Sequence, residues 1–189
     1  MSKGSQLTDE QKDITKKIEL IKKNIGLYPD FPVPGVSFRD TFSILRQPNL
    51  FNTLKSILID AVQTHFMEAE CIAGLDARGF LIGPLIALEL RLPFIPIRKQ
   101  GKLPGKVTSE GYTKEYGKDT VEVQTDSVTP GMKILVVDDL LATGGSLEAS
   151  CHLIEKCQGD VIGCLVIIEI ESLHGRSRLH VPIHSIVKY

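Results

Sequence analysis

The chemically most informative stretch of the chain runs from residue 134 to residue 146 and reads ILVVDDLLATGGS. Two adjacent carboxylates, Asp138 and Asp139, follow four apolar residues and precede a turn of small residues. The apolar run is typical of a strand buried on both faces of a parallel sheet. Glycines at a strand-to-helix turn let the backbone approach a ligand, and the helix start offers unpaired N–H groups to a phosphate. The pattern therefore predicts a loop that binds phosphate and whose carboxylates contact sugar hydroxyls or hydrated Mg²⁺.

The same residues also have a plainer interpretation. Two aspartates after a strand often serve only as turn or helix-cap residues, and two glycines only as a tight connection. Two familiar phosphate loops are excluded, because no Lys follows Gly144 and Gly145 and the spacing is not GxGxxG. The residues alone favour a phosphate and ribose site without identifying a reaction.

A second candidate loop closes the predicted strand at residues 71–75 and reads Asp76-Ala77-Arg78-Gly79. Ligands of open α/β sheets collect at the carboxyl ends of the strands, and both loops lie at such ends. An Arg beside a Gly offers a fork of donors and accessible backbone N–H groups to an anion. Taken alone, a surface Arg in a turn is the simpler interpretation.

Residues 98–118 are polar and basic, and they contain four glycines. A long irregular segment inside a compact domain is usually a working loop, so we expect a lid here. Four basic residues fall within nine positions: Arg98, Lys99, Lys102 and Lys106. In a nearly neutral chain such a cluster favours a compact polyanion such as pyrophosphate over nucleic acid.

The elements that position these loops alternate along the chain. A capping box at Thr8 and Gln11 predicts an opening amphipathic helix that ends at Gly26. Apolar spacing predicts a second helix from Pro48 to about His65. Further strands are expected at residues 71–75, 94–97, 133–137, 161–170 and 181–187, and further helices at residues 83–90 and 145–157. This alternation predicts an α/β fold with a parallel sheet covered on both faces.

Composition sets the remaining limits. A length of 189 residues is most simply one domain, and 42% hydrophobic and 24% charged residues are ordinary for a globular protein. The net charge of −1 gives no electrostatic reason to expect nucleic acid or an anionic membrane as partner, and no apolar stretch reaches spanning length. The four cysteines form no CxxC pair, which favours reduced structural thiols in a cytoplasmic protein. The five histidines form no HExxH set, so a protein-held zinc is not expected.

Residues 138–146 as a whole resemble the phosphoribosyl-pyrophosphate (PRPP) signature of type I phosphoribosyltransferases, and Leu140–Gly145 is similar to the adenine-specific branch. The resemblance covers roughly residues 28–189. It implies the type I fold, a parallel sheet flanked by helices, with an N-terminal helix and base-binding hood in residues 1–40 and a flexible lid at residues 98–118. It also implies a single domain over residues 1–189.

The resemblance assigns roles to the phosphate-binding loops. It implies that Asp138 and Asp139 contact the ribose, and that the 5′-phosphate is held by Ala142, Thr143, Gly144, Gly145 and Ser146. It implies a pyrophosphate site formed by Asp76, Ala77, Arg78, Gly79, Arg98, Lys99 and Lys102, in part across a dimer interface.

The end of the lid reads Glu115-Tyr116-Gly117-Lys118, which matches the adenine branch. The resemblance implies that Glu115 is the general acid/base for the purine, with Tyr116 beside it in the lid. Without the resemblance, a Glu in such a segment is more often a solvated charge.

Residues 31–40, FPVPGVSFRD, resemble the base-binding hood of the adenine branch. Adenine needs a stacking face and backbone groups for its edges. The resemblance assigns these roles to Val36, Ser37, Phe38 and Arg39, with Ile170 as the opposite wall. Core packing is the alternative for Phe38 and Ile170. Ser37 stands where the branch usually has an aliphatic residue, and Ser146 where Thr is common.

The implied reaction converts adenine and PRPP to AMP and pyrophosphate. The resemblance implies Mg²⁺ held mainly by PRPP and water, with no direct protein ligand, and it implies a homodimer. Two alternatives stay open. A phosphoribosyltransferase for a 6-oxopurine or orotate would share residues 138–146. A non-catalytic PRPP-binding regulator would need a DNA-binding module, for which the single helix before Tyr28 leaves no room.

Overall fold

The computed structural model of the chain describes residues 8–114 and 117–189. Its contacts form two compact units, residues 1–58 and residues 59–189, with the boundary inside helix α3 (Pro48–His65). The interpretation of the chain as one domain stays a prediction. None of the described helices is long and apolar enough to cross a membrane.

The first unit opens with helix α1 (Asp9–Asn24), and the predicted capping box is confirmed. The Thr8 hydroxyl accepts from the Gln11 N–H at 3.2 Å, and the Gln11 side chain accepts from the Thr8 N–H at 2.9 Å. A short antiparallel hairpin and one helical turn follow, which the sequence did not predict: β1 (Gly26–Tyr28), β2 (Phe38–Asp40) and α2 (Phe42–Leu45). The hairpin brackets the proline-rich loop of the predicted hood.

The second unit is built on one sheet with the strand order β5-β6-β4-β3-β7-β8-β9. Its strands are β3 (Cys71–Leu75), β4 (Phe94–Lys99), β5 (Val107–Lys114), β6 (Gly117–Gln124), β7 (Lys133–Leu141), β8 (Asp160–Glu169) and β9 (Ile183–Lys188). Strands β4, β3, β7, β8 and β9 pair in parallel, whereas β6 runs antiparallel to both β4 and β5. The predicted α/β class is confirmed.

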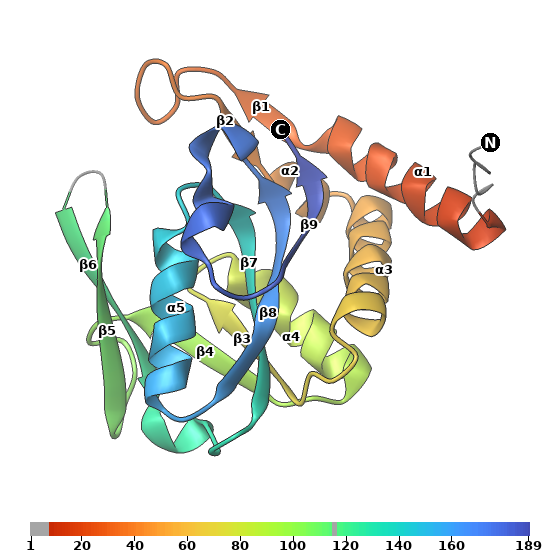
Figure 1. Cartoon of the computed structure of the whole chain (residues 1–189). Helices are drawn as coiled ribbons and strands as arrows, with labels where there is room; N and C mark the ends of the chain where they lie inside the picture. Colours follow the sequence, from red (N-terminus) through yellow and green to blue (C-terminus); the bar gives the residue numbers. More distant parts are fainter. Residues whose placement is uncertain (1–7, 115–116) are drawn as a thin grey trace, which may run out of the picture. The chain divides into compact units, whose positions relative to one another are not determined.

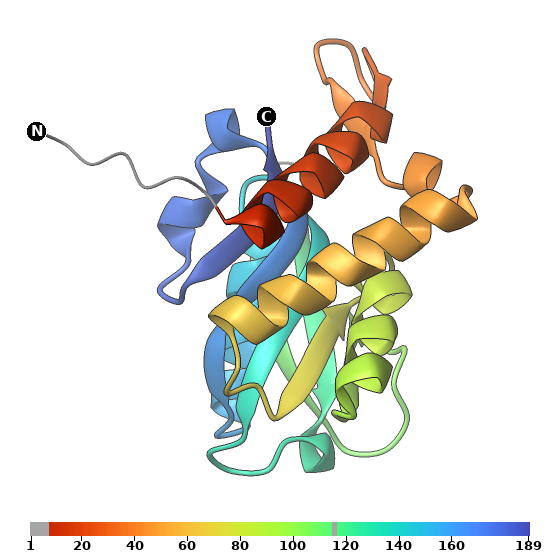
Figure 2. The same ribbon diagram turned by 90° about the vertical axis from the view of Figure 1, so that its right-hand side faces the viewer.

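Helices cover both faces of this sheet. Helix α4 (Gly79–Leu90) and the end of α3 lie on one face, and α5 (Gly145–Lys156) lies on the other (Figures 1 and 2). Three short 3₁₀ helices complete the unit: η1 (Thr125–Ser127), η2 (Glu171–Leu173) and η3 (Gly175–Arg178).

The core explains why the signature strand is rigid. The side chains of Ile134, Leu135, Val136 and Val137 on β7 are fully buried. Complete burial of such a side chain contributes about 1.5–3 kcal/mol, so this strand holds its carboxyl end firmly. All four cysteines are buried and free, and burial raises the pKa of the Cys71 thiol to about 11.

Three predicted boundaries need correction. Most of residues 98–118 is not irregular, because β4 continues to Lys99 and β5 and β6 form a hairpin in which Ser109 pairs with Glu122. Helix α4 begins at Gly79 rather than residue 83. Strand β7 continues to Leu141, because its last residues pair with β8. The two aspartates therefore lie in the strand and not in the turn.

Candidate functional site

The predicted loops of the second unit lie at one edge of its sheet. Strand β3 pairs with β4 on one side and with β7 on the other, so the order in which strands are added to the sheet reverses between β3 and β7. Ligands of α/β sheets bind at the carboxyl ends of the strands beside such a point. A cavity of about 200 Å³ at this edge is lined by Arg78, Asp138, Asp139, Leu140, Ala142, Thr143, Gly144, Gly145, Ser146 and Leu147.

Residues 142–146, here called the phosphate loop, connect β7 to α5. Gly144 is the N-cap of α5 and has φ +85°, a conformation that favours glycine. No side chain caps this helix start, and the first N–H groups of any helix lack an intrahelical acceptor. The loop thus has the backbone geometry that a phosphate requires, as its sequence predicted.

The two aspartates are in different states. Asp139 is 3% exposed, and its Oδ2 lies 3.0 Å from the Nε of Arg78. The Asp139 N–H donates to the Asp138 Oδ1 at 2.9 Å. Burial, followed by the negative charge of Asp139, raises the pKa of Asp138 to about 8. Its surroundings thus favour the protonated form of Asp138, whereas Asp139 is paired with a cation.

The loop after β3 approaches β7 closely. A Cβ on Gly79 would lie 2.6 Å from the carbonyl oxygen of Val137, so only glycine fits where α4 begins beside β7. The peptide bond between Asp76 and Ala77 is cis. The ion pair between Arg78 and Asp139 joins the loop after β3 to the end of β7. Neither motif alone predicted this pair.

The basic residues at the end of β4 and just beyond it differ in their partners and in their position relative to the site. The Arg98 Nε lies 3.0 Å from the Asp76 Oδ2, and its Nη1 donates to the Lys102 carbonyl at 3.2 Å. The Lys99 Nζ lies 4.0 Å from the Asp119 Oδ2. A second cavity, of about 60 Å³, is lined by Leu75, Asp76, Ile97, Arg98, Lys99, Tyr112, Val121, Asp138 and Ser146. Arg98 and Lys99 thus border the site, while the exposed Lys102 does not line this cavity.

Tyr112 is a site residue that the sequence interpretation missed. It lies on β5, and its hydroxyl accepts from the Ser146 Oγ at 3.2 Å and donates to the Asp119 Oδ2 at 3.4 Å. Val107, Thr108, Tyr112 and Thr113 have strand propensity, a signal that the polar composition and the glycines of the segment concealed. Tyr112 connects the hairpin to the phosphate loop.

The remaining predicted residues stay untested. Glu115 and Tyr116 lie outside the described residues. Val36–Arg39 belong to the first unit, where the Phe38 ring packs edge-on against Phe31 with centroids 5.1 Å apart. Ile170 follows β8 in the second unit, and its N–H donates to the Leu141 carbonyl at 3.0 Å.

The sequence matches the phosphoribosyl transferase domain family over residues 40–184. It is 46% identical over 173 residues to the adenine phosphoribosyltransferase of Drosophila pseudoobscura pseudoobscura, which covers 92% of this chain and 96% of that relative. The chain belongs to the adenine phosphoribosyltransferase family. The family predicted from the motifs is therefore confirmed.

Solved structures of adenine phosphoribosyltransferases share the fold. The Saccharomyces cerevisiae enzyme, complexed with adenine and an imino-altritol bisphosphate, gives a TM-score of 0.85 at 37% identity, covering 92% of this chain and 99% of the other. The Trypanosoma brucei enzyme, in complex with AMP, pyrophosphate and ribose-5-phosphate, gives 0.82 at 28% identity, covering 97% and 82%. The type I phosphoribosyltransferase architecture is confirmed.

Proposed function

We propose that the loops at the carboxyl edge of the second unit carry out the reaction of the adenine phosphoribosyltransferase family. In this reaction adenine displaces pyrophosphate from PRPP and AMP is formed, a step of purine salvage. The observation that carries the proposal is the ion pair between Arg78 and Asp139, which holds the loop after β3 against the end of β7, next to the phosphate loop. One edge thereby offers a helix start for a monophosphate and a basic group for a second anion.

The 5′-phosphate is assigned to the phosphate loop, and the ribose is assigned to the end of β7. The phosphate accepts from the N–H groups of residues 142–146, and the ribose hydroxyls contact Asp138 and Asp139. In its protonated form, which burial favours, Asp138 can donate a hydrogen bond as well as accept one. Asp139 is paired with Arg78.

Pyrophosphate is assigned to the backbone of residues 76–79 and to the side chains of Arg78, Arg98, Lys99 and Lys102. Displacement at the anomeric carbon develops positive charge on the ribose ring and negative charge on the leaving group. Positioned cations stabilise the leaving group without reorganising during the reaction. Arg98 is already oriented by Asp76 and the Lys102 carbonyl.

The base assignments rest on the resemblance. Adenine is assigned to Val36, Ser37, Phe38, Arg39 and Ile170. Its imidazole proton is assigned to Glu115, with Tyr116 beside it in the lid. A carboxylate within hydrogen-bond reach of this proton can accept it as the new bond to ribose forms.

We further propose Mg²⁺ as the cofactor, a homodimer as the assembly and the cytoplasm as the location. The carboxylates near the two cavities are hard oxygen donors of the kind that Mg²⁺ and its waters prefer. In the described part of the chain, no group of three or more His, Cys, Asp and Glu side chains is placed to hold a metal. Asp76 and Asp138 line these cavities and fit hydrogen bonding to metal-bound water, and the ion would neutralise charge on the leaving group.

The test is a substrate screen with purified protein, PRPP and Mg²⁺, in which adenine, hypoxanthine, guanine and orotate are compared. We expect a nucleotide product from adenine alone. A product from another base would assign the protein to a different branch. Binding of PRPP with no AMP formed would support a non-catalytic regulator. The same assay with Asp139→Asn controls for a contaminating enzyme, because contaminant activity would not change.

A further inference from the structure

The segment that follows β8 packs its backbone directly on the phosphate loop. A Cβ on Gly175 would lie 2.1 Å from the Ala142 carbonyl oxygen and 2.9 Å from the Gly144 nitrogen. In the opposite direction, a Cβ on Gly144 would lie 2.4 Å from the Gly175 carbonyl oxygen. Neither position has room for a side chain, so the two backbones set each other's position.

A side-chain pair strengthens this contact. The Arg178 Nη2 lies 2.7 Å from the Glu148 Oε2, and Glu148 is in the first turn of α5. The residues of η3 therefore contact both the turn before α5 and the start of the helix itself.

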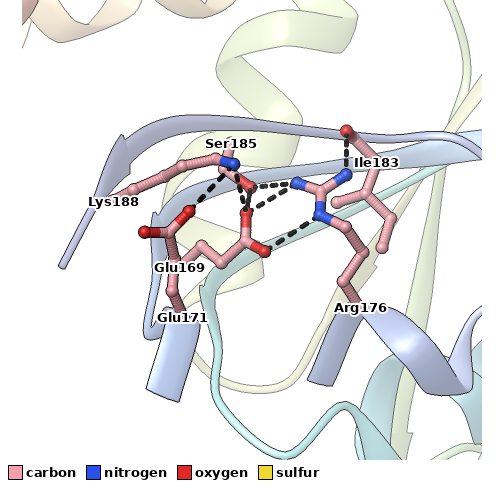
Figure 3. A network of polar contacts seen from close by, with 6 residues as sticks. All are labelled: Glu169, Glu171, Arg176, Ile183, Ser185 and Lys188. Atoms are coloured by element: carbon pink, nitrogen blue, oxygen red, sulfur yellow. Dashed lines mark hydrogen bonds and ion pairs between the residues drawn. The ribbon is translucent and has the colours of Figure 1, made fainter. Parts of the chain in front are cut away.

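Arg176, between these two contacts, is fixed to the sheet (Figure 3). Its Nε donates to the Glu169 Oε1 at 2.9 Å and its Nη2 to the Glu169 Oε2 at 2.6 Å. The remaining nitrogen, Nη1, donates to the Ile183 carbonyl at 2.8 Å. Ser185 donates to Glu169 and accepts from Arg176. We call Glu169, Arg176 and Ser185 the clamp.

The bonds of the clamp fix the position of η3 relative to the end of β8. Glu169 is 5% exposed at the end of β8, and its forked bond with Arg176 lowers the pKa of its carboxyl group. Two-pronged pairs of this kind are geometrically strict and stronger than neutral hydrogen bonds. Removing Arg176 would leave the buried Glu169 carboxylate with only Ser185 and the more distant Lys188, whose Nζ lies 3.8 Å from its Oε2, so the end of β8 would lose its forked bond.

We propose that Gly175 and Arg176 are positioning residues for the 5′-phosphate site. The clamp holds η3 in place, and Gly175 then supports the phosphate loop at Ala142 and Gly144. The loop is thereby set before ligand arrives. This inference rests on the proposed function, because it takes residues 142–146 as the phosphate site. Neither residue needs to touch substrate.

The test compares Gly175→Ala with Gly163→Ala in the full-length protein. Gly163 lies nearer the amino end of β8, and a Cβ there would lie 2.3 Å from the Phe66 ring and 2.8 Å from the Pro182 carbonyl oxygen, so it controls for overpacking that does not touch residues 142–146. The probe is ribose 5-phosphate, with its Kd measured by calorimetry. We expect Gly175→Ala to raise this Kd by about ten- to a hundredfold, because small displacements of a binding group have effects of this size. Gly163→Ala should lower Tm but change the Kd less than about twofold.

A kinetic comparison separates positioning from general damage. Gly175→Ala should raise the KM for PRPP on the same scale while the KM for adenine changes less than about threefold. A Kd equal to that of the wild type, or an equal rise of both KM values, would overturn the inference.

Arg176→Lys decides the question if Gly175→Ala does not fold. It keeps the charge but loses the fork, and we expect the Kd for ribose 5-phosphate to rise about three- to tenfold. If the Kd of Arg176→Lys is unchanged and the wild type makes AMP, the inference is overturned but the proposed function is not. Failure of the proposed function looks different, because the wild type itself would then neither bind ribose 5-phosphate nor make AMP.

Discussion

The phosphate loop and the β5–β6 hairpin border the same edge of the sheet but are held in different ways. The phosphate loop is fixed by backbone packing against Gly175, and the end of β7 before it is held by the ion pair of the partly exposed Arg78 with the buried Asp139. The β5–β6 hairpin is joined to the sheet by the pairing of β6 with β4 and by the buried side chains of Val121 and Val123. Its outer strand β5 also makes an ion pair between Glu110 and Lys156 and a bond between Tyr112 and Ser146. An ion pair with an exposed partner such as Lys156 contributes about 0–1 kcal/mol.

This difference separates two tasks. A site for a phosphate that is present throughout the reaction benefits from geometry that exists before binding. A segment that must admit substrate and then exclude water benefits from contacts that break at low cost. Strand β5 lies at the edge of the sheet and is the part of the hairpin to which the lid prediction applies, and this lid stays a prediction. The phosphate loop, in contrast, is packed against Gly175 in the free protein.

The largest effect should come from the lid. Glu115→Gln keeps the shape of the side chain but cannot act as a base, so turnover should fall about 10²–10⁴-fold with little change in PRPP affinity. Single-turnover kinetics measures this directly. Glu155→Gln is the control, because Glu155 is on α5 and its carboxylate contacts His180. A chemical step slowed less than about tenfold would make Glu115 a solvated lid charge.

The second prediction concerns the contribution of Asp138, at the end of β7, to the stability of the protein. The pKa of Asp138 is raised to about 8 in the folded protein by burial and then by Asp139. The folded state therefore holds a proton that the unfolded state releases near its ordinary pKa, and this group's contribution to stability falls as pH rises between these two values. The slope is up to about 1.4 kcal/mol per pH unit.

Asp138→Asn should remove that slope. Urea unfolding of both proteins from about pH 4 to about pH 9 would show the variant gaining stability relative to wild type as pH rises. Curves that stay parallel would mean that Asp138 titrates near its ordinary pKa.

The third prediction concerns the proposed contact between Asp139 and the ribose. Asp139→Asn removes the charge opposite Arg78, so PRPP affinity and turnover should fall, with a loss of about 1–3 kcal/mol in transition-state stabilisation. Steady-state kinetics with varied PRPP gives this value. Asp126→Asn is the control, because Asp126 is an exposed residue of η1, before β7. Normal PRPP kinetics in Asp139→Asn would refute the ribose assignment.

Phe38 tests the base assignment independently of both regions. Phe38→Ala should raise the KM for adenine by a factor that corresponds to about 1–3 kcal/mol, the value of a lost stacking contact. PRPP binding by the free protein should be nearly unchanged. Phe42→Ala removes another ring from the same unit, one that is 46% exposed, and should affect neither substrate. Equal damage to PRPP binding by Phe38→Ala would show that Phe38 is a packing residue.

The smallest effect should come from the hydrogen bond that links the β5–β6 hairpin to the phosphate loop. Tyr112→Phe removes only the hydroxyl that contacts Ser146 and Asp119, a loss of about 0.5–1.5 kcal/mol. The KM for PRPP should rise modestly while Tm is nearly constant. Tyr28→Phe, in the first unit, supplies the matched control. If PRPP binding is unchanged in Tyr112→Phe, the hairpin and the phosphate loop are not coupled through this bond.

Local patterns predicted much of this structure. The apolar run at residues 134–137 identified the central strand, and Thr8 with Gln11 identified the start of α1, because both signals lie within a few neighbouring residues. The hairpin was missed because its strands are polar and lie at the sheet edge, where alternation is weak.

The contacts that hold the site were beyond sequence reasoning. Arg78 and Asp139 are far apart in the chain, as are Gly144 and Gly175, and only the parallel register of β3, β7 and β8 brings them together. Motifs predicted which residues bind anions, but not which residues hold those residues in place.

A crystal structure of the protein with AMP tests the account most directly. We expect the phosphate of AMP to accept hydrogen bonds from the backbone N–H groups of residues 143–146, with the ribose hydroxyls at Asp138 and Asp139. The phosphate loop should superpose on its position in the free protein, still packed on Gly175. A phosphate bound instead by Arg78 and Arg98, or a phosphate loop that rebuilds on binding, would contradict the account.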